Sequence, residues 1–367
     1  MLYKDLCGMS VSALGLGCMR FPTEPGQPNR FIREEAQKII DEAIANGINY
    51  FDTAYSYQNG DSERLLGEAL KKYPRESYYL GTKFSLSVIQ DIEKAFEEQL
   101  ERLQTDYVDF YMLHWLHEGS IDAYTDKGKD YIGFLKKQKE LGRIRKIGFS
   151  SHAVPTTLER FLKHFDDYDM AIIQLNYLDW TLLDAKRQYK ILTEHNIPIW
   201  VMEPLKGGRL ADLGEEANKI LKEAAPDRSI ASWGMRWLMS LPNVNTVMSG
   251  MGSLEQLRDN CETFAKNDPL SETEAAALEK AKNLFVNQLG VPCSACRYCC
   301  KTCPAGLNIP LLIQGYNEAS IGGQGTWKLG NLAGEKGAEL CLQCGICRTH
   351  CPQKIDIPEI MRKIAKK

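Results

Sequence analysis

The sequence predicts an α/β protein in which a (β/α)8 barrel is followed by a small α+β domain. Three observations support this fold class. The chain has 367 residues, short apolar runs alternate with helical patterns from residue 13 to about 265, and nine of the 12 cysteines lie between Cys293 and Cys351. A chain of this length exceeds one small domain and accommodates a barrel-sized domain plus a compact second one.

Eight apolar runs are predicted to be the strands of the first domain. Each run is short and is followed by a segment with helical periodicity. The runs are Ala13–Cys18, Asn49–Asp52, Tyr78–Thr82, Tyr107–Leu113, Ile144–Phe149, Ala171–Leu175, Ile197–Met202 and Val244–Met248.

The segments between the runs are predicted to be amphipathic helices that cover the sheet. One ends before Gly47, a glycine that can adopt the left-handed conformation after a helix. A second is predicted to start after Ser87. The apolar faces are Ala36, Ile39, Ile40, Ala43 and Ile44 in the first helix, and Val88, Ile92, Ala95, Phe96 and Leu103 in the second.

Eight strand–helix units in about 250 residues favour a closed barrel. A doubly wound parallel sheet has the same alternation and is the rival architecture. Such sheets usually carry G-x-G-x-x-G after the first strand when they bind dinucleotides. The first strand here reads Leu-Gly-Leu-Gly-Cys over residues 14–18, which does not fit that pattern. The barrel is therefore preferred.

Composition divides the chain into three parts. Residues 1–266 are expected to form the barrel, residues 267–290 a helical linker, and residues 291–367 the cysteine-rich domain. Ser271 and Glu274 have the spacing of a capping box at the start of the linker helix. The glycine-rich stretch 321–337 between the two cysteine runs is predicted to be a loop.

Charge and hydropathy argue against several classes of protein. The formal net charge is −3, so no basic field recruits nucleic acid. No stretch approaches the roughly 20 apolar residues that span a bilayer. The first ten residues carry Lys4 and Asp5 and do not resemble a secretory signal. We therefore expect a cytoplasmic protein without nucleic-acid or membrane partners, whose cysteines stay reduced.

Two cysteine runs share the spacing C-x2-C-x2-C-x3-C-P, which is typical of bacterial ferredoxins. In that pattern three cysteines of one run hold a [4Fe–4S] cluster and the fourth ligates the other cluster. The predicted ligands are Cys293, Cys296, Cys299 and Cys351 for one cluster, and Cys341, Cys344, Cys347 and Cys303 for the other. Cys300 lies outside this spacing and is expected to be a spectator.

Zinc binding and a purely structural cluster are the two alternative roles for these cysteines. Structural zinc sites use separated C-x2-C pairs rather than triplets, so the spacing argues against zinc. A cluster that holds the small domain together without passing electrons remains an alternative, since metal binding couples to folding.

Polar residues stand at the ends of three successive predicted strands. Asp52 closes the second strand, Lys83 the third and His114 the fourth, while Tyr57 lies in the loop after the second. Active sites of (β/α)8 barrels lie at these strand ends, so the four side chains are expected to meet. The lysine would lower the pKa of the tyrosine, which could then donate a proton near neutral pH. On composition alone, His117 is as available as His114.

With these residues in place, positions 1 to about 265 resemble the aldo-keto reductases. The matching pieces are Phe51-Asp52-Thr53-Ala54-x2-Tyr57, Ser62-Glu63-x3-Gly67, Gly81-Thr82-Lys83, Asp109-x4-His114, Gly148-Phe149-Ser150, Gln174, Pro204-Leu205-x2-Gly208 and the stretch from Gln256 to Asn260. The whole chain resembles the subset of that family with a C-terminal, ferredoxin-like dicluster domain.

The resemblance implies NAD(P)H as hydride donor and an aldehyde or ketone as acceptor. It places the catalytic tetrad at Asp52, Tyr57, Lys83 and His114, and so selects His114 over His117. It implies that Ser150 and Gln174 bind the carboxamide side of the nicotinamide. The other cofactor contacts that it implies are Leu205, Gly250, Met251, Gly252, Gln256 and Asn260.

Three departures from the family pattern bear on the cofactor. Met202 stands where many relatives stack an aromatic ring on the nicotinamide. The stretch 249–256 has no cation for a 2′-phosphate, although Arg258 or Lys206 could compensate, and this leaves NAD versus NADP open. His152 stands near a position where asparagine is common. A flavin in place of the nicotinamide is a further alternative.

We therefore expect an oxidoreductase that transfers a hydride between a nicotinamide and a carbonyl, with two [4Fe–4S] clusters for electron transfer and a redox partner protein. The alternative is an electron-transfer or partner-docking iron–sulfur protein whose barrel binds a nicotinamide or flavin without ordinary carbonyl-reductase turnover. A hydride carries two electrons and each cluster passes one, so direct exchange between nicotinamide and cluster is poor chemistry.

Overall fold

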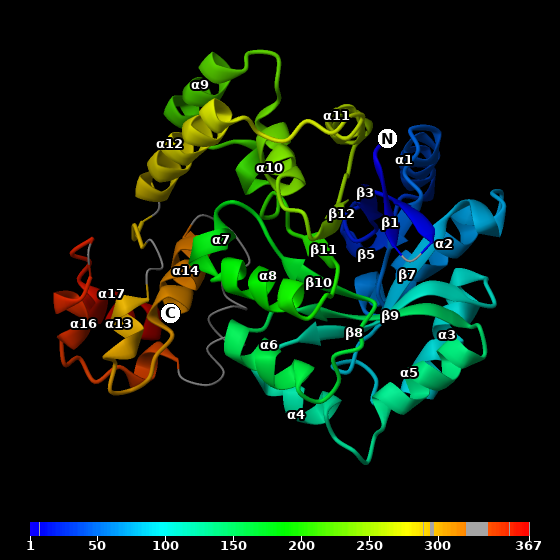
Figure 1. The fold of residues 1–367 in the computed structure, drawn as a ribbon, viewed down its shortest axis with the longest axis horizontal. Coiled ribbons are helices and arrows are strands. Elements are labelled where there is room, and N and C mark those ends of the chain that lie inside the picture. Colours follow the sequence, from blue (N-terminus) through cyan, green and yellow to red (C-terminus); the bar gives the residue numbers. More distant parts are fainter. Residues whose placement is uncertain (7, 289, 294–296, 321–336, 352, 367) are drawn as a thin grey trace.

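The computed structural model describes residues 1–6, 8–288, 290–293, 297–320, 337–351 and 353–366. The eight predicted strands form a closed parallel barrel (Figure 1), so the predicted barrel is confirmed. The order around the barrel is β10-β11-β12-β3-β6-β7-β8-β9. The strands are β3 (Leu14–Gly17), β6 (Tyr50–Asp52), β7 (Tyr79–Phe84), β8 (Val108–Leu116), β9 (Ile144–Ser151), β10 (Met170–Gln174), β11 (Ile199–Met202) and β12 (Val244–Ser249).

A short antiparallel hairpin, β1 (Tyr3–Leu6) and β2 (Met9–Ser12), closes one end of the barrel. Leu6 and Val11 belong to the same buried cluster as the barrel residues Tyr50 and Trp200. The Ser12 backbone N–H donates to the side chain of Asn49, the residue before β6. The hairpin therefore lies at the N-terminal ends of the strands, opposite the end where barrel enzymes bind ligands. This hairpin is not among the predicted strands.

Helices cover the outside of the barrel, as the amphipathic patterns predict (Figure 1). They are α1 (Arg33–Ala45), α2 (Asp61–Leu70), α3 (Ile92–Leu103), α4 (Ile121–Tyr124), α5 (Tyr131–Glu140), α6 (Pro155–Leu162), α7 (Asp179–Leu182), α8 (Ala185–Glu194), α9 (Glu215–Ala224), α10 (Ile230–Met239) and α11 (Leu254–Thr263). Gly47 has φ +86°, as expected for the residue that ends α1.

The predicted start of the second helix after Ser87 is wrong. The helix α3 begins at Ile92, because the Asp91 side chain accepts a hydrogen bond from the backbone N–H of Lys94 at 3.0 Å and caps it there. Val88 consequently lies outside the helix and is exposed rather than on its buried face.

The helix α12 (Glu272–Gln288) follows the barrel and begins with the predicted capping box. The Ser271 backbone N–H donates to the Glu274 side chain at 2.9 Å, and the Glu274 N–H donates to the Ser271 hydroxyl at 3.3 Å. Leu278 belongs to a buried cluster that includes Leu221 of α9 and Trp233 of α10. This helix therefore packs against helices of the barrel.

The C-terminal domain has a core of its own. Its described helices are α13 (Tyr298–Lys301), α14 (Ile309–Ser320), α16 (Ile346–Thr349) and α17 (Ile357–Ala365). Apolar residues such as Ile313 and Met361 share one buried cluster with the cysteines of both runs. The predicted loop over 321–337 lies, except for Gly337, outside the described residues. Across the described ranges, no helix is long and apolar enough to cross a membrane.

Candidate active site

Asp52 and Lys83 form a buried ion pair where β6 and β7 end. The Lys83 ammonium donates to Asp52 Oδ1 and also to the backbone oxygen of Thr53 at 2.7 Å. The other carboxylate oxygen of Asp52 accepts from the Tyr50 hydroxyl at 3.0 Å. Burial alone would lower the pKa of Lys83, but the negative charge of Asp52 and the proximity of Tyr57 raise it above its ordinary value. Lys83 is therefore held as a fixed ammonium.

Tyr57 follows this pair in the loop after β6, at the start of a 3-10 turn over Tyr57–Gly60. Its ring centroid lies 5.2 Å from the Lys83 ammonium nitrogen. Gln58 and Asn59 have φ angles of 45° and 54°, so the backbone that orients Tyr57 occupies the left-handed region at two successive residues.

The direction of the Tyr57 pKa shift corrects the expectation from sequence. Burial raises the pKa of Tyr57, and the Lys83 ammonium offsets only part of that effect, so the pKa stays above its ordinary value. The reason is that burial destabilises the phenolate by more free energy than the neighbouring Lys83 ammonium provides in stabilisation. Tyr57 is consequently a protonated phenol at neutral pH and is available as a proton donor.

His114 lies on the other side of Tyr57, with the two ring centroids 5.8 Å apart in an edge-on arrangement. It lies within β8, because that strand extends past its predicted end to Leu116. Burial lowers the pKa of His114 well below its ordinary value, and the Lys83 charge adds to the effect, so the imidazole is neutral. His117 instead accepts from the Gly119 backbone N–H at 3.1 Å and caps a turn. The structure therefore brings His114, and not His117, to the other three residues.

Ser85 is a further residue of the site, outside the predicted set. Its hydroxyl oxygen lies 2.8 Å from His114 Nδ1 and 3.1 Å from the Ser56 hydroxyl, and its single proton can be donated to only one of them at a time. A neutral imidazole carries its proton on one nitrogen only, so the group bonded to Nδ1 decides whether Nε2 can donate. Strand alternation could have indicated Ser85. Residues two positions apart on a strand point to the same face, and Ser85 is two positions after Lys83.

Gln174 lies at the end of β10 and is fixed by a buried charged network. Its side-chain amide donates to Asp179 Oδ2 at 2.8 Å. Asp179 also accepts from the Asn176 amide at 2.7 Å and from the Lys206 ammonium at 2.8 Å. Ser150, the other residue predicted to bind the carboxamide, is buried and accepts from the Trp115 backbone N–H at 2.8 Å.

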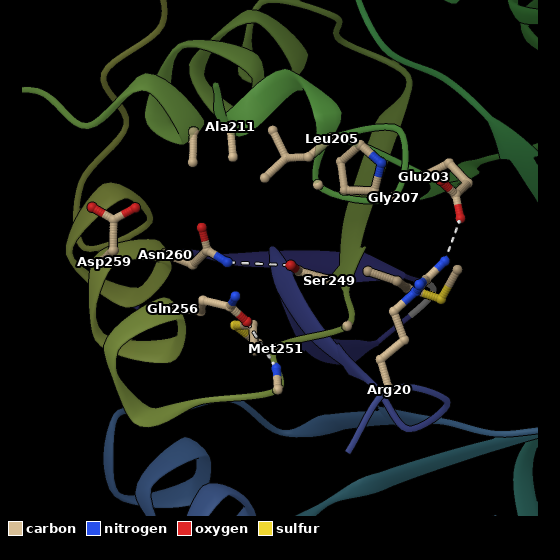
Figure 2. A pocket seen from close by; sticks show the side chains of 16 residues that line it. Arg20, Glu203, Leu205, Gly207, Ala211, Ser249, Met251, Gln256, Asp259 and Asn260 are labelled. Carbon is tan, nitrogen blue, oxygen red and sulfur yellow. Dashed lines mark hydrogen bonds and ion pairs between the residues drawn. The ribbon is translucent and has the colours of Figure 1, made fainter. Parts of the chain in front are cut away.

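A cavity of about 550 Å³ lies between the loops that follow β11 and β12 (Figure 2). Six of the eight predicted cofactor residues line it: Leu205, Gly250, Met251, Gly252, Gln256 and Asn260. The Gly252 backbone N–H donates to Gln256 at 2.9 Å, and the Asn260 amide donates to Ser249 at 3.2 Å. The elongated shape of a dinucleotide needs such a cavity beside the strand ends, so the residues present fit the cofactor.

Arg20 lines the same cavity and was not predicted. Figure 2 shows it facing Glu203 across the cavity edge, with a nitrogen–oxygen distance of 3.5 Å. Of the described residues that line the cavity, Arg20 is the one basic side chain. Its position in the chain could have indicated this role. Arg20 lies three residues after the end of β3, and the loops that follow barrel strands bind ligands.

The two cations considered as substitutes for a phosphate-binding residue are engaged elsewhere. Arg258 is exposed and pairs with Glu42 at 2.8 Å. Lys206 is buried and pairs with Asp179. Neither is among the described residues that line the cavity. The cavity also contains the carboxylates of Glu203 and Asp259, so the structure supplies little positive charge for a 2′-phosphate.

The predicted cluster ligands gather in the C-terminal domain, and all the described cysteines are free thiols. Cys296 lies outside the described residues. Burial raises the pKa of Cys347 to about 11, and the neighbouring thiols of Cys341, Cys344 and Cys303 add to the rise. Cys303 of the first run thus lies near Cys347 of the second run. Across the described residues, no three cysteine, histidine or acidic side chains are grouped closely enough to hold a metal ion, so the two ligand sets stay predictions.

The first cysteine run also reaches the barrel. Arg297, Asn308 and Leu311 of the C-terminal domain line a small cavity of about 20 Å³ together with barrel residues that include His152 and Gln174. The Arg297 guanidinium donates to Asn308 at 3.2 Å. Arg297 of this run therefore lies near the wall of the barrel that carries Gln174.

The fold and the site define a class of protein, namely a (β/α)8 oxidoreductase with a buried acid–base group beside a dinucleotide-sized cavity. Residues 13–283 match the model of the aldo/keto reductase family, and the chain belongs to that family. Residues 292–356 match the model of a 4Fe-4S dicluster domain.

Related proteins agree with this membership. The uncharacterized oxidoreductase YqkF of Bacillus subtilis (strain 168) is 30% identical over 306 residues, covering 74% of this chain and 92% of that protein. The NADH-specific methylglyoxal reductase of Escherichia coli (strain K12) is 26% identical, covering 74% and 95%. The solved holo form of aldo-keto reductase AKR11C1 from Bacillus halodurans has a TM-score of 0.63 at 29% identity, covering 77% and 96%.

Proposed function

We propose that this chain catalyses NAD(P)H-dependent hydride transfer between a carbonyl and an alcohol, and that its C-terminal domain holds two [4Fe–4S] clusters for electron transfer. The observation that carries the first part is the buried Asp52–Lys83 pair beside protonated Tyr57 and neutral His114. When bound, the nicotinamide supplies the hydride that reduces the carbonyl carbon of a small aldehyde or ketone.

The four side chains divide the acid–base work. Tyr57 donates its phenolic proton to the oxygen of the carbonyl. The Lys83 ammonium, fixed by Asp52, stabilises the phenolate that remains. His114 donates from Nε2 to the same oxygen when Ser85 donates to Nδ1, and so orients the carbonyl. In the reverse direction the Tyr57 phenolate accepts the proton of an alcohol.

The cofactor would lie along the rim from the larger cavity to β10. Gln256 and Asn260 would hold the adenosine end, Arg20 would pair with the diphosphate, and Ser150 and Gln174 would bind the carboxamide. We infer a preference for NADH over NADPH, because the cavity has two carboxylates and Arg20 as its basic group among the described residues. The related NADH-specific reductase supports this choice.

The C-terminal domain would bind both clusters through Cys293, Cys296, Cys299 and Cys351 and through Cys341, Cys344, Cys347 and Cys303. We assign residues 1–266 to the reductase barrel, 267–290 to the connecting helix and 291–367 to the dicluster domain. A cytoplasmic location fits the free thiols, because reducing compartments keep cysteines available as metal ligands.

A second candidate function is an iron–sulfur protein that transfers electrons or docks a partner, with a barrel that binds a nicotinamide or flavin without ordinary turnover. The cavity that Arg297 of the first cysteine run shares with Gln174 favours it, because it puts that run beside the part of the barrel proposed to bind the nicotinamide. An absorption spectrum of the protein after anaerobic cluster removal distinguishes a bound flavin from a nicotinamide.

The proposed function is tested by Tyr57→Phe in the anaerobically purified holoprotein. We expect the turnover of aldehydes with NADH to fall by a factor of about 10² to 10⁴, because a general acid contributes that much. Binding of NADH, followed by fluorescence, should not change. Tyr3→Phe, which removes an exposed hydroxyl at the far end of the barrel, is the control. Unchanged turnover in Tyr57→Phe would remove Tyr57 from the mechanism.

A further inference from the structure

The two cysteine runs face different surroundings. The first run contacts the barrel through Arg297, and α14, which follows it, lies beside α7 of the barrel. The second run surrounds α16, which Figure 1 shows at the end of the molecule away from the barrel. The cluster held by Cys341, Cys344, Cys347 and Cys303 is therefore the outer one.

Exposed apolar side chains are concentrated around this second run. Leu340, Leu342 and Ile346 are three of the eight large apolar side chains that the described residues expose, and all three lie within seven positions of the chain. We call them the outer patch. They flank Cys344, which is itself exposed. Apolar groups exposed together on a small domain mark interaction surfaces, because leaving them in water costs free energy.

The segment that carries the outer patch has more basic than acidic side chains. Arg362 donates to the side chain of Gln343, the residue after Leu342, at 3.1 Å, and its guanidinium also pairs with Glu359. Arg348 directly follows Cys347 in the chain and pairs with Asp356 at 3.2 Å, with both side chains about half exposed. Residues 337–366 contain five basic side chains and three acidic ones, whereas the whole chain has a net charge of −3. This end of the molecule is thus more basic than the rest, and it suits a partner with an acidic surface.

We propose that the outer patch is the docking surface for a small acidic one-electron carrier protein. This inference rests on the proposed function, in that it requires the outer cluster to be bound. In each encounter the reduced cluster, [4Fe–4S]⁺, passes one electron to the oxidised carrier. The cluster returns to [4Fe–4S]²⁺, the carrier gains one electron, and no bond or proton is exchanged.

Three observations combine in this assignment. The exposed ligand Cys344 lets a partner approach the outer cluster closely. The outer patch gives the encounter complex an apolar centre, and Arg348 and Arg362 give it a charged rim. Such an arrangement of an apolar centre and a complementary charged rim is what transient protein interfaces need for fast, specific association.

The test uses the full-length holoprotein with both clusters, reduced anaerobically and freed of excess reductant. Its oxidation is followed by stopped-flow absorbance with an acidic two-cluster ferredoxin as the carrier and methyl viologen as a small-molecule control. We compare the wild type with Leu342→Glu and Arg362→Glu. The matched control is Leu141→Glu, because Leu141 is 62% exposed on the barrel and Leu342 is 68% exposed.

Leu342→Glu and Arg362→Glu should each lower the second-order rate constant with ferredoxin by about tenfold. Their rates with methyl viologen should match the wild type, and so should both rates of Leu141→Glu. Added salt should slow the wild-type reaction with ferredoxin, since the steering is electrostatic. Iron content and the visible spectrum confirm that each variant retains its clusters.

Equal ferredoxin rates in the wild type and both patch variants would overturn the inference. It would also be overturned by sedimentation data showing a wild-type dimer that Leu342→Glu dissociates, because the outer patch would then bind a second copy of this chain. Both results are compatible with intact clusters and carbonyl reduction. Failure of the proposed function is distinct, and would appear as absent cluster absorbance or absent turnover in the wild type.

Discussion

The side-chain amide nitrogen of Gln174 donates to Asp179 at 2.8 Å, so the carbonyl oxygen of Gln174 is the group left to accept a hydrogen bond. A carboxylate only accepts, and this fixes which end of the Gln174 amide faces it. Asp179 also holds Lys206, which belongs to the loop between β11 and the larger cavity. The buried Asp179 carboxylate therefore links Gln174, proposed to bind the nicotinamide, to the loop of Lys206, which lies beside the larger cavity.

Asp179→Ala should lower the free energy of unfolding by about 3–5 kcal/mol, because it leaves the Lys206 ammonium buried without its carboxylate. Urea denaturation followed by circular dichroism measures the change. Lys190→Ala removes an exposed lysine that pairs with Glu194, and should alter stability by well under about 1 kcal/mol. An equally small effect of Asp179→Ala would show that the network does not hold the two loops together.

Ser85→Ala should lower kcat/KM for aldehyde reduction by about tenfold, because His114 loses the hydroxyl that determines its tautomer. Ser85→Thr keeps the hydroxyl and should restore most of the activity. NADH affinity should be the same in all three proteins. A loss in Ser85→Ala that the threonine does not rescue would point to packing rather than to the tautomer.

His114 predicts a pH dependence of stability. Its pKa is lowered in the folded protein, so below about pH 6.5 the unfolded chain binds a proton that the folded protein does not. Its contribution to stability is therefore full above that pH and is lost as the pH falls. The free energy of unfolding of the wild type, relative to His114→Phe, should decrease by up to about 1.4 kcal/mol per pH unit. A constant difference from pH 8 to pH 5 would contradict a buried neutral histidine.

Cofactor preference can be changed at the larger cavity. The wild type should bind NADH about tenfold more tightly than NADPH, and Gln256→Arg should narrow or reverse that ratio by adding a cation. Fluorescence titration gives both dissociation constants. Arg258→Ala should leave the ratio unchanged, since Arg258 pairs with Glu42 outside the cavity. A loss of NADPH binding in Arg258→Ala would show that Arg258 moves to the phosphate.

The elements that could be predicted from sequence are those with strong local patterns. All eight barrel strands are apolar runs, and Asp52, Lys83 and His114 could be located because each follows such a run. The spacing of the two cysteine runs likewise predicted the 4Fe-4S dicluster domain that residues 292–356 match. These features depend on periodicity or spacing alone, which a sequence records directly.

The missed features depend on contacts between distant segments. Arg20 reaches Glu203 across 183 positions, and no local pattern connects them. The pKa of Tyr57 was misjudged because the sequence shows its cation but not its burial. The β1–β2 hairpin was missed because its strands are four residues each, too short for a clear alternation.

That hairpin has a practical consequence for redesign. Leu6 and Val11 pack against the side chains inside the barrel and cover the N-terminal ends of its strands. Cofactor and substrate would therefore bind and leave at the C-terminal ends. Changes to the β1–β2 hairpin should therefore not alter which substrates or cofactors the barrel binds. The rim loops, and the C-terminal domain that contacts them, are the parts to rebuild.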